Sequence, residues 1–354
     1  MEYSAMDYQY KLGIYIGRFQ PFHNGHRAVV YKALETCEHI RIVVGSAGLA
    51  PSSKNPFSFQ QRRGMIILSF PQAIRDRISI VSQRDFDYNE NLWLSQIMQH
   101  AHGEKNTAII GHNKDESSYY LSKFKEWKFL EVENFEQLNA TDVRECLYKM
   151  IENDEYPDVY DDLRSSLEEM VPANVFEELI ELVDEGNTRI VEALAQREAI
   201  NNYKKSWASA PFPPVFVTGD AVVVQGAHVL LIQRGGDLGY GQWAIPGGFI
   251  NQDESVEDCI IRELMEETKI KVPEKVLKGS IKGIKYFDHP KRSLRGRSIT
   301  FAGLIELDDS LPLPKVTAAD DAMKAWWHPI SDIPSASMFE DHYQILTDIL
   351  KINQ

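Results

Sequence analysis

The sequence predicts a two-domain α/β protein, in which a parallel sheet covered by helices on both faces precedes a smaller α+β domain. Two patterns lead to this fold class. Short apolar runs alternate with amphipathic runs in the first half, and the last third contains strand-like runs around one strong helix. The length agrees, because 354 residues exceed what one hydrophobic core usually organises.

The first half is expected to contain four buried strands separated by helices. The strands are predicted at residues 12–17, 39–45, 77–82 and 107–111, and the helices at 26–36, 60–70 and 92–101. In sheets of this kind ligands bind at the carboxyl ends of the strands. We therefore look for functional residues directly after these strands.

Prolines mark the middle of the chain. A helical pattern over residues 142–205 is interrupted at Pro157 and Pro172, and Pro211, Pro213 and Pro214 then exclude a helix or a central strand. We predict a first domain over residues 8–186, a helical linker over 187–202 and a second domain over 203–354. The second domain should contain strands at 215–224, 229–234, 280–287 and 299–307 and a helix at 256–267.

Composition excludes several classes of protein. With 38 Lys and Arg against 52 Asp and Glu, the net charge of −14 argues against general binding of nucleic acid. Cys37, Cys146 and Cys259 are odd in number and far apart, which indicates neither a disulfide framework nor a thiolate zinc site. No apolar run reaches the roughly 20 residues of a membrane span, and residues 1–10 lack the features of a signal peptide, so a cytoplasmic protein is expected.

A histidine pair follows the first predicted strand. His23 and His26 lie three residues apart at the expected start of a helix. Gly17, with Arg18 beside it, precedes the pair, and Gly25 allows close approach of the backbone to a ligand. A helix N-terminus offers unpaired N–H groups and a partial positive charge, which suit phosphate. Imidazole groups there can donate hydrogen bonds to phosphoryl oxygens. The alternative is a pair that only caps the helix or bonds within the core.

Three separated segments of the first half resemble the nucleotidyltransferase superfamily with the His-x-Gly-His signature. That signature stands at residues 23–26, and residues 55–62 are similar to the Asn-Pro-Phe-Thr stretch of archaeal-type nicotinamide mononucleotide (NMN) adenylyltransferases. A Ser/Thr-x-x-Arg motif stands at a helix start, with Thr141 as the expected N-cap and Arg144 one turn later. Residues 111, 112, 114 and 115 fall where that family has its fourth-strand loop. The resemblance covers residues 10–148.

The resemblance implies transfer of an adenylyl group from ATP to NMN, which gives NAD and pyrophosphate. It assigns His23 and His26 to the α- and β-phosphates, Arg144 and Thr141 to the leaving pyrophosphate, and Mg²⁺ to the triphosphate. Trp93 matches the position of the tryptophan that stacks on nicotinamide, with a core tryptophan as the alternative. The residues expected to bind ATP or NMN are Gly17, Arg18, Phe19, Arg62, Trp93, Gly111 and Thr141.

An acidic helix follows a glycine pair in the last third. Glu263, Glu266 and Glu267 stand at i, i+3 and i+4, a spacing that places three carboxylates on one helical face. Adjacent anions repel one another unless cations lie between them, and Mg²⁺ or Mn²⁺ prefers oxygen ligands. A solvated acidic face is the alternative. The spacing from Gly248 to Ile270 resembles the Nudix box, with a lysine in place of its final glycine at Lys269.

The Nudix resemblance covers residues 203–354 and implies metal-assisted hydrolysis of a substituted nucleoside diphosphate. It implies Glu263, Glu267 and the backbone carbonyl of Gly247 as metal ligands, with Glu266 as a further ligand or an orienter of water. Arg262 is expected to pair with Glu254 or a neighbour. The general base is open between Asp320 and Asp321, and helix capping is the alternative role of both.

A basic loop is expected to contact the phosphates of this second substrate. Residues 291–297 contain four cations, and a similar loop occurs in ADP-ribose-type Nudix domains, so Arg292 or Arg295 is expected to bind the diphosphate of ADP-ribose. A solvated surface loop is the alternative.

Together the two halves resemble the bifunctional NMN adenylyltransferase/Nudix hydrolases of bacteria. The predicted fold is a Rossmann-like doubly wound sheet followed by an α+β Nudix fold. The predicted second reaction converts ADP-ribose to AMP and ribose 5-phosphate, and a homo-oligomer is possible on sequence grounds. The rivals are a nucleotidyltransferase of the phosphopantetheine or FMN type, a Nudix domain that acts on NADH, and an ADP-ribose sensor without hydrolytic activity.

Overall fold

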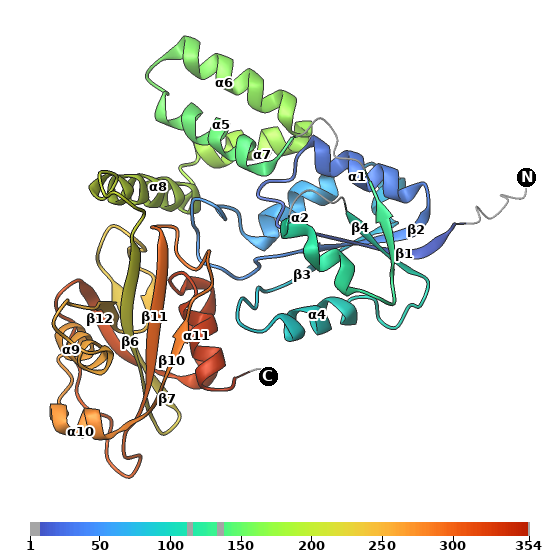
Figure 1. The fold of residues 1–354 in the computed structure, drawn as a ribbon. Helices are drawn as coiled ribbons and strands as arrows, with labels where there is room; N and C mark the ends of the chain where they lie inside the picture. Colours follow the sequence, from blue (N-terminus) through green and yellow to red (C-terminus); the bar gives the residue numbers. More distant parts are fainter. Residues whose placement is uncertain (1–7, 112–115, 133–137, 353–354) are drawn as a thin grey trace, which may run out of the picture. The chain divides into compact units, whose positions relative to one another are not determined.

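The computed structural model describes residues 8–111, 116–132 and 138–352. The chain divides into two compact units, residues 1–194 and residues 195–354. The expected parallel sheet lies in the first unit and the expected α+β arrangement in the second, which confirms the predicted fold class (Figure 1). None of the described helices is both long and apolar enough to cross a lipid bilayer.

The first unit is built on a five-stranded parallel sheet. The strand order is β3-β2-β1-β4-β5, and every neighbouring pair is parallel. The strands are β1 (Tyr10–Gly17), β2 (Cys37–Val44), β3 (Ile78–Ser82), β4 (Thr107–Gly111) and β5 (Lys128–Glu131). Four of them lie where apolar runs predict strands. The edge strand β5 was not predicted, because it is short and mostly exposed.

The order of the strands creates a crevice at one edge of this sheet. The chain builds β1, β2 and β3 in one direction and then crosses over to place β4 on the other side of β1. Ile14 in β1 is paired with Arg41 in β2 and with Ile109 in β4. Crossovers therefore leave β1 and β4 in opposite directions, and ligands bind at such reversals beside the carboxyl ends of the strands.

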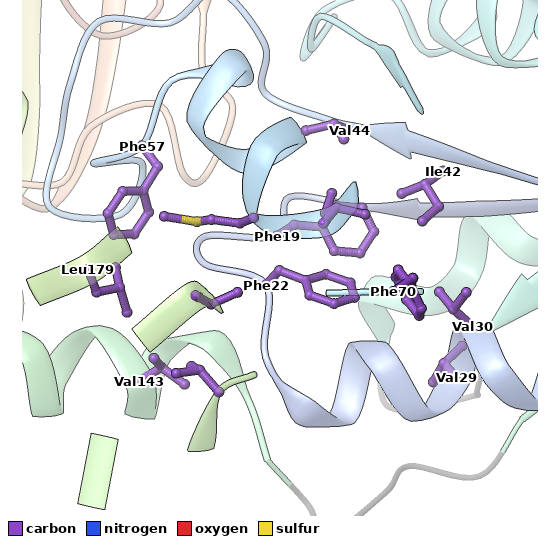
Figure 2. Packing of buried hydrophobic residues seen from close by; sticks show 14 of the residues in the cluster. Phe19, Phe22, Val29, Val30, Ile42, Val44, Phe57, Phe70, Val143 and Leu179 are labelled. Atoms are coloured by element: carbon purple, nitrogen blue, oxygen red, sulfur yellow. The ribbon is translucent and has the colours of Figure 1, made fainter. Parts of the chain in front are cut away.

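Helices of the first unit are α1 (Asn24–Leu34), α2 (Phe59–Leu68), α3 (Gln72–Arg75), α4 (Glu90–Gln99), α5 (Ala140–Glu152), α6 (Pro157–Met170) and α7 (Ala173–Asp184), with a 3-10 helix at Glu116–Lys123. Pro157 is the first residue of α6 and Pro172 the N-cap of α7, positions where a missing N–H costs nothing. Phe19 and Phe22, in the loop between β1 and α1, are buried and pack with Phe57 and Phe70 in the core (Figure 2).

The second unit contains a mixed sheet with the order β10-β11-β6-β7-β12. Its strands are β6 (Val215–Gln225), β7 (His228–Arg234), β8 (Trp243–Ala244), β9 (Gly247–Phe249), β10 (Ile281–Phe287), β11 (Arg297–Glu306) and β12 (Ala322–Pro329). Among the described strands of this sheet, only β11 and β6 pair in parallel. Helices α9 (Val256–Thr268), α10 (Glu274–Gly279) and α11 (His342–Ile349) complete the unit, and α9 packs on β6 through Ile260 and Leu264.

One long helix, α8 (Thr188–Ser206), contains the point at which the chain passes from one compact unit to the other. Residues 188–202 of the proposed linker are therefore helical. Near the end of α8, the rings of Tyr203 and Trp207 contact Phe216 of β6. The domain limits 8–186 and 203–354 remain a proposal.

Candidate active sites

The first cavity opens at the carboxyl ends of β1 and β4, where the strand order reverses. It has a volume of about 300 Å³ and is bordered by Gly17 and Gly111, the last residues of these two strands. It brings together predicted residues from three distant parts of the sequence. Those lining the cavity are Gly17, Arg18, Phe19, His23, His26, Gly111, Thr141 and Arg144.

The two histidines form a reciprocal cap at the start of α1. The backbone N–H of His26 donates to Nδ1 of His23, and the backbone N–H of His23 donates to Nδ1 of His26, both at 3.3 Å. Their rings are stacked with centroids 3.5 Å apart. Because both Nδ1 atoms accept hydrogen bonds, each neutral ring carries its proton on Nε2. The capping alternative is therefore correct as a description of Nδ1, and the proton on Nε2 makes that atom a hydrogen-bond donor.

Arg144 lies one turn into α5 and is held by polar groups. Its Nη1 donates to the carbonyl oxygens of Gln20 at 2.6 Å and Ala140 at 3.0 Å, and Nη2 donates to the Thr141 hydroxyl at 3.2 Å. Burial lowers the pKa of this guanidinium, with a further contribution from Arg18. The side chain thus costs energy to keep charged, which makes an anionic ligand favourable there.

The cap of α5 corrects one sequence expectation. We expected Thr141 to be the N-cap, but Asn139 is the N-cap and its side chain accepts from the N–H groups of Thr141 and Asp142. Asparagine is one of the residues preferred at this position. Thr141 is therefore the second residue of the helix, exposed to the cavity.

Arg62 does not line the cavity, which corrects its assignment as a phosphate-binding residue. Its side chain is 1% exposed. Nη1 donates to the carbonyl oxygens of Arg18 at 2.6 Å and Gly45 at 2.7 Å, and Nη2 donates to that of Ser46 at 3.3 Å. Burial lowers the pKa of Arg62 to about 10. Arg62 thus connects the loops after β1 and β2 and positions the cavity wall.

Trp93 also stands outside the lining of the cavity. Its ring contacts Tyr120 edge-on, with centroids 5.5 Å apart, and lies against Phe124, whereas Tyr120 itself lines the cavity. A direct stack of Trp93 on a ligand remains a prediction. Of the fourth-strand loop, residues 112, 114 and 115 lie outside the described part of the chain.

Phe19 lines the cavity from a strained position. It has a φ of 52°, is buried, and places its ring against Gly17 and edge-on to His26. A Cβ atom at Gly17 would lie 2.8 Å from the Phe19 ring. Gly17 is therefore required for close packing of this loop, and the Phe19 ring supports His26.

The second cavity lies in the second unit, between the glycine pair, α9 and the segment that precedes α11. Its volume is about 330 Å³. The predicted residues that line it are Gly247, Glu263, Glu267, Arg292 and Arg295, and both candidate bases, Asp320 and Asp321, are present as well.

Carboxylates lie directly against the glycine pair. A Cβ atom at Gly247 would collide with Asp220, and one at Gly248 would collide with Glu263. The backbone N–H of Gly247 also donates to Oε2 of Glu267 at 2.9 Å. Glycine is therefore needed at both positions so that the backbone can approach these acidic groups.

Two of the three predicted glutamates face the cavity, and their ionisation is opposed there. Burial is the main cause that raises the pKa of Glu267 to about 8, and the nearby Glu263 and Asp321 contribute to this rise. Burial also raises the pKa of Glu263. Carboxylates in such a setting gain from a bound cation, which favours their negative form.

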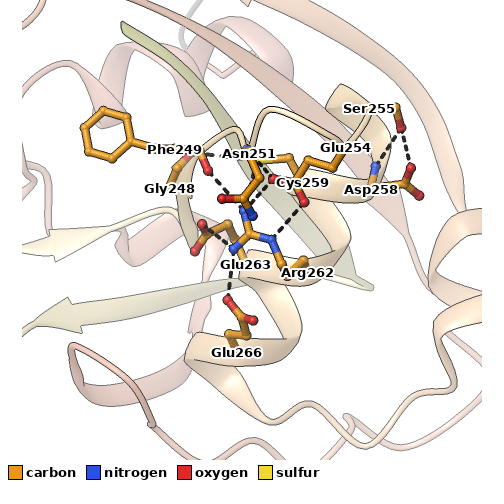
Figure 3. A network of polar contacts seen from close by, with 10 residues as sticks. All are labelled: Gly248, Phe249, Asn251, Glu254, Ser255, Asp258, Cys259, Arg262, Glu263 and Glu266. Atoms are coloured by element: carbon orange, nitrogen blue, oxygen red, sulfur yellow. Dashed lines mark hydrogen bonds and ion pairs between the residues drawn. The ribbon is translucent and has the colours of Figure 1, made fainter.

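Glu266 corrects the expectation of three carboxylates on one functional face. It is absent from the cavity lining, and its Oε2 accepts from Nη1 of Arg262 at 2.9 Å. Arg262 also donates to Glu263 at 2.7 Å and makes a two-point contact with Glu254 at 2.6 and 2.9 Å (Figure 3). The expected pair of Arg262 and Glu254 is thus present, and the same guanidinium also binds Glu266.

The two arginines of the basic loop are held by the segment before α11. Arg292 is buried and makes a two-point contact with Asp341, both bonds at 2.9 Å, and a third bond to the Ser298 hydroxyl. Arg295 pairs with Glu340 at 3.4 Å and lies over the rings of Phe249 and Phe339. Both arginines reach the cavity, so the loop is more than solvated surface.

Asp320 and Asp321 precede the strand β12, so helix capping, the alternative role, is wrong for both. They are exposed at the cavity. Asp320 has a φ of 55°, a left-handed conformation that aspartate tolerates better than most residues.

Several cavity residues were missed by the sequence analysis. Asp220 is a buried carboxylate inside the apolar strand β6, and its bond from the Thr300 hydroxyl is 2.5 Å long. A charged residue in an otherwise apolar strand was the available signal. Arg234, Phe339, Glu340 and His342 also line the cavity and belong to no motif that was recognised.

The donor set fits a divalent cation only in part. Glu263 and Glu267 are acidic, buried and close to the backbone of the glycine pair, as a hard cation requires. No group of three or more His, Cys, Asp or Glu side chains among the described residues is arranged as a ready metal cage. Arg262 already bonds Glu263 and Glu266, so metal binding must compete with this guanidinium.

Comparison with known proteins identifies both halves of the chain. Residues 14–145 match the Cytidylyltransferase-like family and residues 216–349 match the NUDIX domain family. A nicotinamide/nicotinic acid mononucleotide adenylyltransferase of Acinetobacter baylyi is 38% identical over 153 residues, which cover 41% of this chain and 81% of that protein. An ADP-ribose pyrophosphatase of Methanocaldococcus jannaschii is 28% identical over 135 residues, 38% of this chain and 73% of that protein.

A solved structure matches almost the whole chain. It is a bifunctional NMN adenylyltransferase/ADP ribose pyrophosphatase of Francisella tularensis, complexed with AMP and a Mn ion. The two are 35% identical, with a TM-score of 0.85 over 97% of this chain and 99% of that one. This chain belongs to the family of bifunctional NMN adenylyltransferase/ADP-ribose pyrophosphatases, in which a cytidylyltransferase-like domain is joined to a NUDIX domain.

Proposed function

We propose that the first unit transfers the adenylyl group of ATP to NMN, giving NAD and pyrophosphate. The observation that carries this proposal is the stacked pair of His23 and His26, donors at Nε2 when neutral, in a cavity that the first residues of α1 and α5 also line. The NMN 5′-phosphate attacks the α-phosphorus of ATP, and no protein nucleophile is needed. Alignment of two bound reactants can supply about 7–11 kcal/mol of the rate acceleration.

Each residue of the first cavity has one role in this proposal. His23 and His26 donate to oxygens of the α- and β-phosphates as charge moves toward the leaving group. Arg144 and Thr141 hold the pyrophosphate, and the exposed Arg18 attracts the incoming phosphates. Mg²⁺ would supply charge neutralisation across the triphosphate.

The acceptor is tested by competition. The protein is incubated with ATP, Mg²⁺ and equal amounts of NMN, nicotinic acid mononucleotide, phosphopantetheine and FMN, and the dinucleotide products are separated by chromatography. More NAD should form than adenylylated phosphopantetheine or FMN. His26→Ala should reduce NAD formation by orders of magnitude. Preferential formation of the FMN or phosphopantetheine product would overturn the proposal.

We propose that the second unit hydrolyses ADP-ribose to AMP and ribose 5-phosphate. The observation that carries this proposal is that acidic and basic side chains line the same cavity. Glu263 and Glu267 come from α9, and Arg292 and Arg295 come from the basic loop. The arginines bind the diphosphate. Glu263, Glu267 and the carbonyl of Gly247 would hold a divalent ion, Mg²⁺ or Mn²⁺, with Glu266 as a further candidate ligand after rearrangement of Arg262. The bound ion would lower the pKa of a water molecule and polarise the phosphate.

The base that orients the attacking water is proposed to be Asp320 or Asp321, since both reach the cavity from the loop before β12. Single substitutions to Asn distinguish them, because only loss of the base should flatten the acidic limb of the pH–rate profile.

An enzyme and a sensor differ in one measurement. Metal-dependent release of AMP from ADP-ribose, abolished by a chelator and by Glu267→Gln, is expected of the enzyme. Binding of ADP-ribose without AMP release would indicate a sensor. Faster release of AMP from NADH than from ADP-ribose would identify NADH as the preferred substrate.

A further inference from the structure

The residues directly before and at the start of α11 form one wall of the second cavity, although no sequence motif marks them. Phe339, Glu340 and His342 line the cavity, and Asp341 holds Arg292. Asp341 and Glu340 therefore account for the orientation of both arginines, whereas His342 pairs with neither. The function of the imidazole has to be sought elsewhere.

The orientation of the His342 ring is fixed by a backbone group. The N–H of Ile245 donates to Nδ1 of His342 at 3.0 Å, and both residues are buried. Ile245 lies two residues before Gly247 in the segment that brings the glycine pair to the cavity. Since Nδ1 is an acceptor, the neutral ring carries its proton on Nε2 and is a donor at that atom.

Burial and three nearby guanidinium groups favour the uncharged form of this ring. Burial lowers the pKa of His342 well below its usual value, and Arg292, Arg234 and Arg295 lower it further. Such a ring has no nitrogen available to accept a proton, because Nδ1 is bonded and Nε2 is protonated. His342 is therefore unsuited to the role of general base, although it is a histidine in a hydrolase cavity.

We propose that His342 is a substrate-binding residue of the second cavity, whose Nε2–H donates a hydrogen bond to a diphosphate oxygen of the nucleotide substrate. The acceptor is anionic because Arg234, Arg292 and Arg295 line the same cavity and concentrate negative charge there. This inference rests on the proposed function of the second unit and adds a residue to it.

Two amide substitutions separate the two nitrogens of the ring. In His342→Asn the amide lies near the position of Nδ1, so it keeps an acceptor for the Ile245 N–H and loses the distant donor. In His342→Gln the longer side chain places an N–H donor near the position of Nε2 and gives up the bond to Ile245. The pair thus distinguishes support of the fold from contact with substrate.

The experiment uses the full chain with ADP-ribose and Mg²⁺, and measures KM, kcat, Tm and, without metal, the affinity for ADP-ribose. His342→Asn should keep its Tm within a few degrees and raise KM about 10-fold to 100-fold, as expected for loss of a hydrogen bond to a charged group. His342→Gln should recover most of this KM despite a lower Tm, and the acidic limb of the pH–rate profile should be unchanged in both.

Three results would overturn the inference. The first is a normal KM in His342→Asn. The second is a rise in KM in both variants that follows the fall in Tm alone. The third is a shift of the acidic limb of the pH–rate profile, which would make His342 a base. Failure of the proposed hydrolysis gives a different pattern. If the wild type binds ADP-ribose but releases no AMP, and His342→Asn binds ADP-ribose at least about 10-fold more weakly than the wild type, the inference stands without the hydrolysis.

Discussion

Single nitrogen and oxygen atoms decide the chemistry of both cavities. The histidines of the first cavity and His342 of the second are bonded through Nδ1 to backbone N–H groups, which leaves a donor at Nε2 in every neutral ring. The backbone thereby selects the tautomer, and each imidazole is prepared to donate to phosphate oxygen. This property depends on where the backbone lies and not only on the residue type.

Replacement of His23 by Asn tests the donor without removal of the cap. Asparagine is a good N-cap and can still accept from the His26 N–H, so the stability should change by less than about 0.5 kcal/mol. The Nε2 donor is lost, and the rate of NAD formation should fall about 10²-fold to 10³-fold. Steady-state assays with ATP and NMN measure the rate, and urea unfolding measures the stability. A rate within a few-fold of the wild type would exclude His23 from the reaction.

The pH dependence of stability should report on Glu267. Burial raises the pKa of its carboxyl from 4.5 to about 8 in the folded protein without metal. The folded state then binds the proton more tightly, so the stabilisation is complete below the unfolded pKa and is lost as pH rises through about 8. We expect the free energy of unfolding of metal-free protein to fall over this range, with each unit of pKa difference worth about 1.4 kcal/mol.

Two comparisons check the origin of this effect. Glu267→Gln should remove most of the slope between about pH 5 and 8, because the amide does not titrate. Mg²⁺ should restore the stability of the wild type at pH 8 by binding the ionised carboxylate. An unchanged slope in Glu267→Gln would assign the effect to another group.

At the level of elements, helix ends determine which motif residues reach the ligands. At the end of α9, Lys269 replaces the final glycine of the Nudix box. This lysine has a φ of 43° and a ψ of 35°, the left-handed conformation that glycine adopts without strain. The helix therefore ends as a glycine would end it, with a lysine in an unfavourable conformation.

Lys269→Gly should stabilise the protein. Relief of the left-handed conformation is worth about 1 kcal/mol, and hydrolysis of ADP-ribose should be unaffected because Lys269 does not line the cavity. Lys149→Gly inside α5 is the matched control and should destabilise by about 0.5–1 kcal/mol. Chemical denaturation of both variants gives the comparison, and a destabilised Lys269→Gly would show that the side chain makes a compensating contact.

The elements differ in how well their sequences predict them. Strands β1 to β4 are apolar runs between amphipathic helices, a pattern specific enough to give their positions. Strands β5 and β12 mix polar, charged and aromatic residues on exposed edges, and α11 follows two short 3-10 turns. Nothing in their local periodicity distinguishes such elements from loops, since their partners in the sheet lie far away in the sequence.

For the whole molecule, surplus negative charge and two polyphosphate cavities are compatible because the cations are local. The chain carries a net charge of −14, yet Arg18 and Arg144 line the first cavity, and Arg234, Arg292 and Arg295 line the second. Specific recognition of phosphate thus needs a few oriented donors and not a basic surface.

The two activities should be separable within one chain, because each cavity is lined by residues of one compact unit. His26→Ala should abolish NAD formation and spare release of AMP from ADP-ribose, and Glu267→Gln should do the reverse. Both activities are measured on the same preparation, and the ratio of the two losses should exceed about 100-fold. Loss of both activities in either variant would show that the sites depend on each other.

The sequence by itself determined the two fold classes, the order of the domains and the location of both motifs, because periodicity and spacing along the chain are local properties. Only the tertiary structure decided which motif residues face a ligand. It turned Glu266 toward Arg262, used Arg62 to join loops, and brought Asp220 and residues 339–342 to the second cavity. Such outcomes depend on burial and on contacts between residues that are distant in sequence, which motif spacing does not specify.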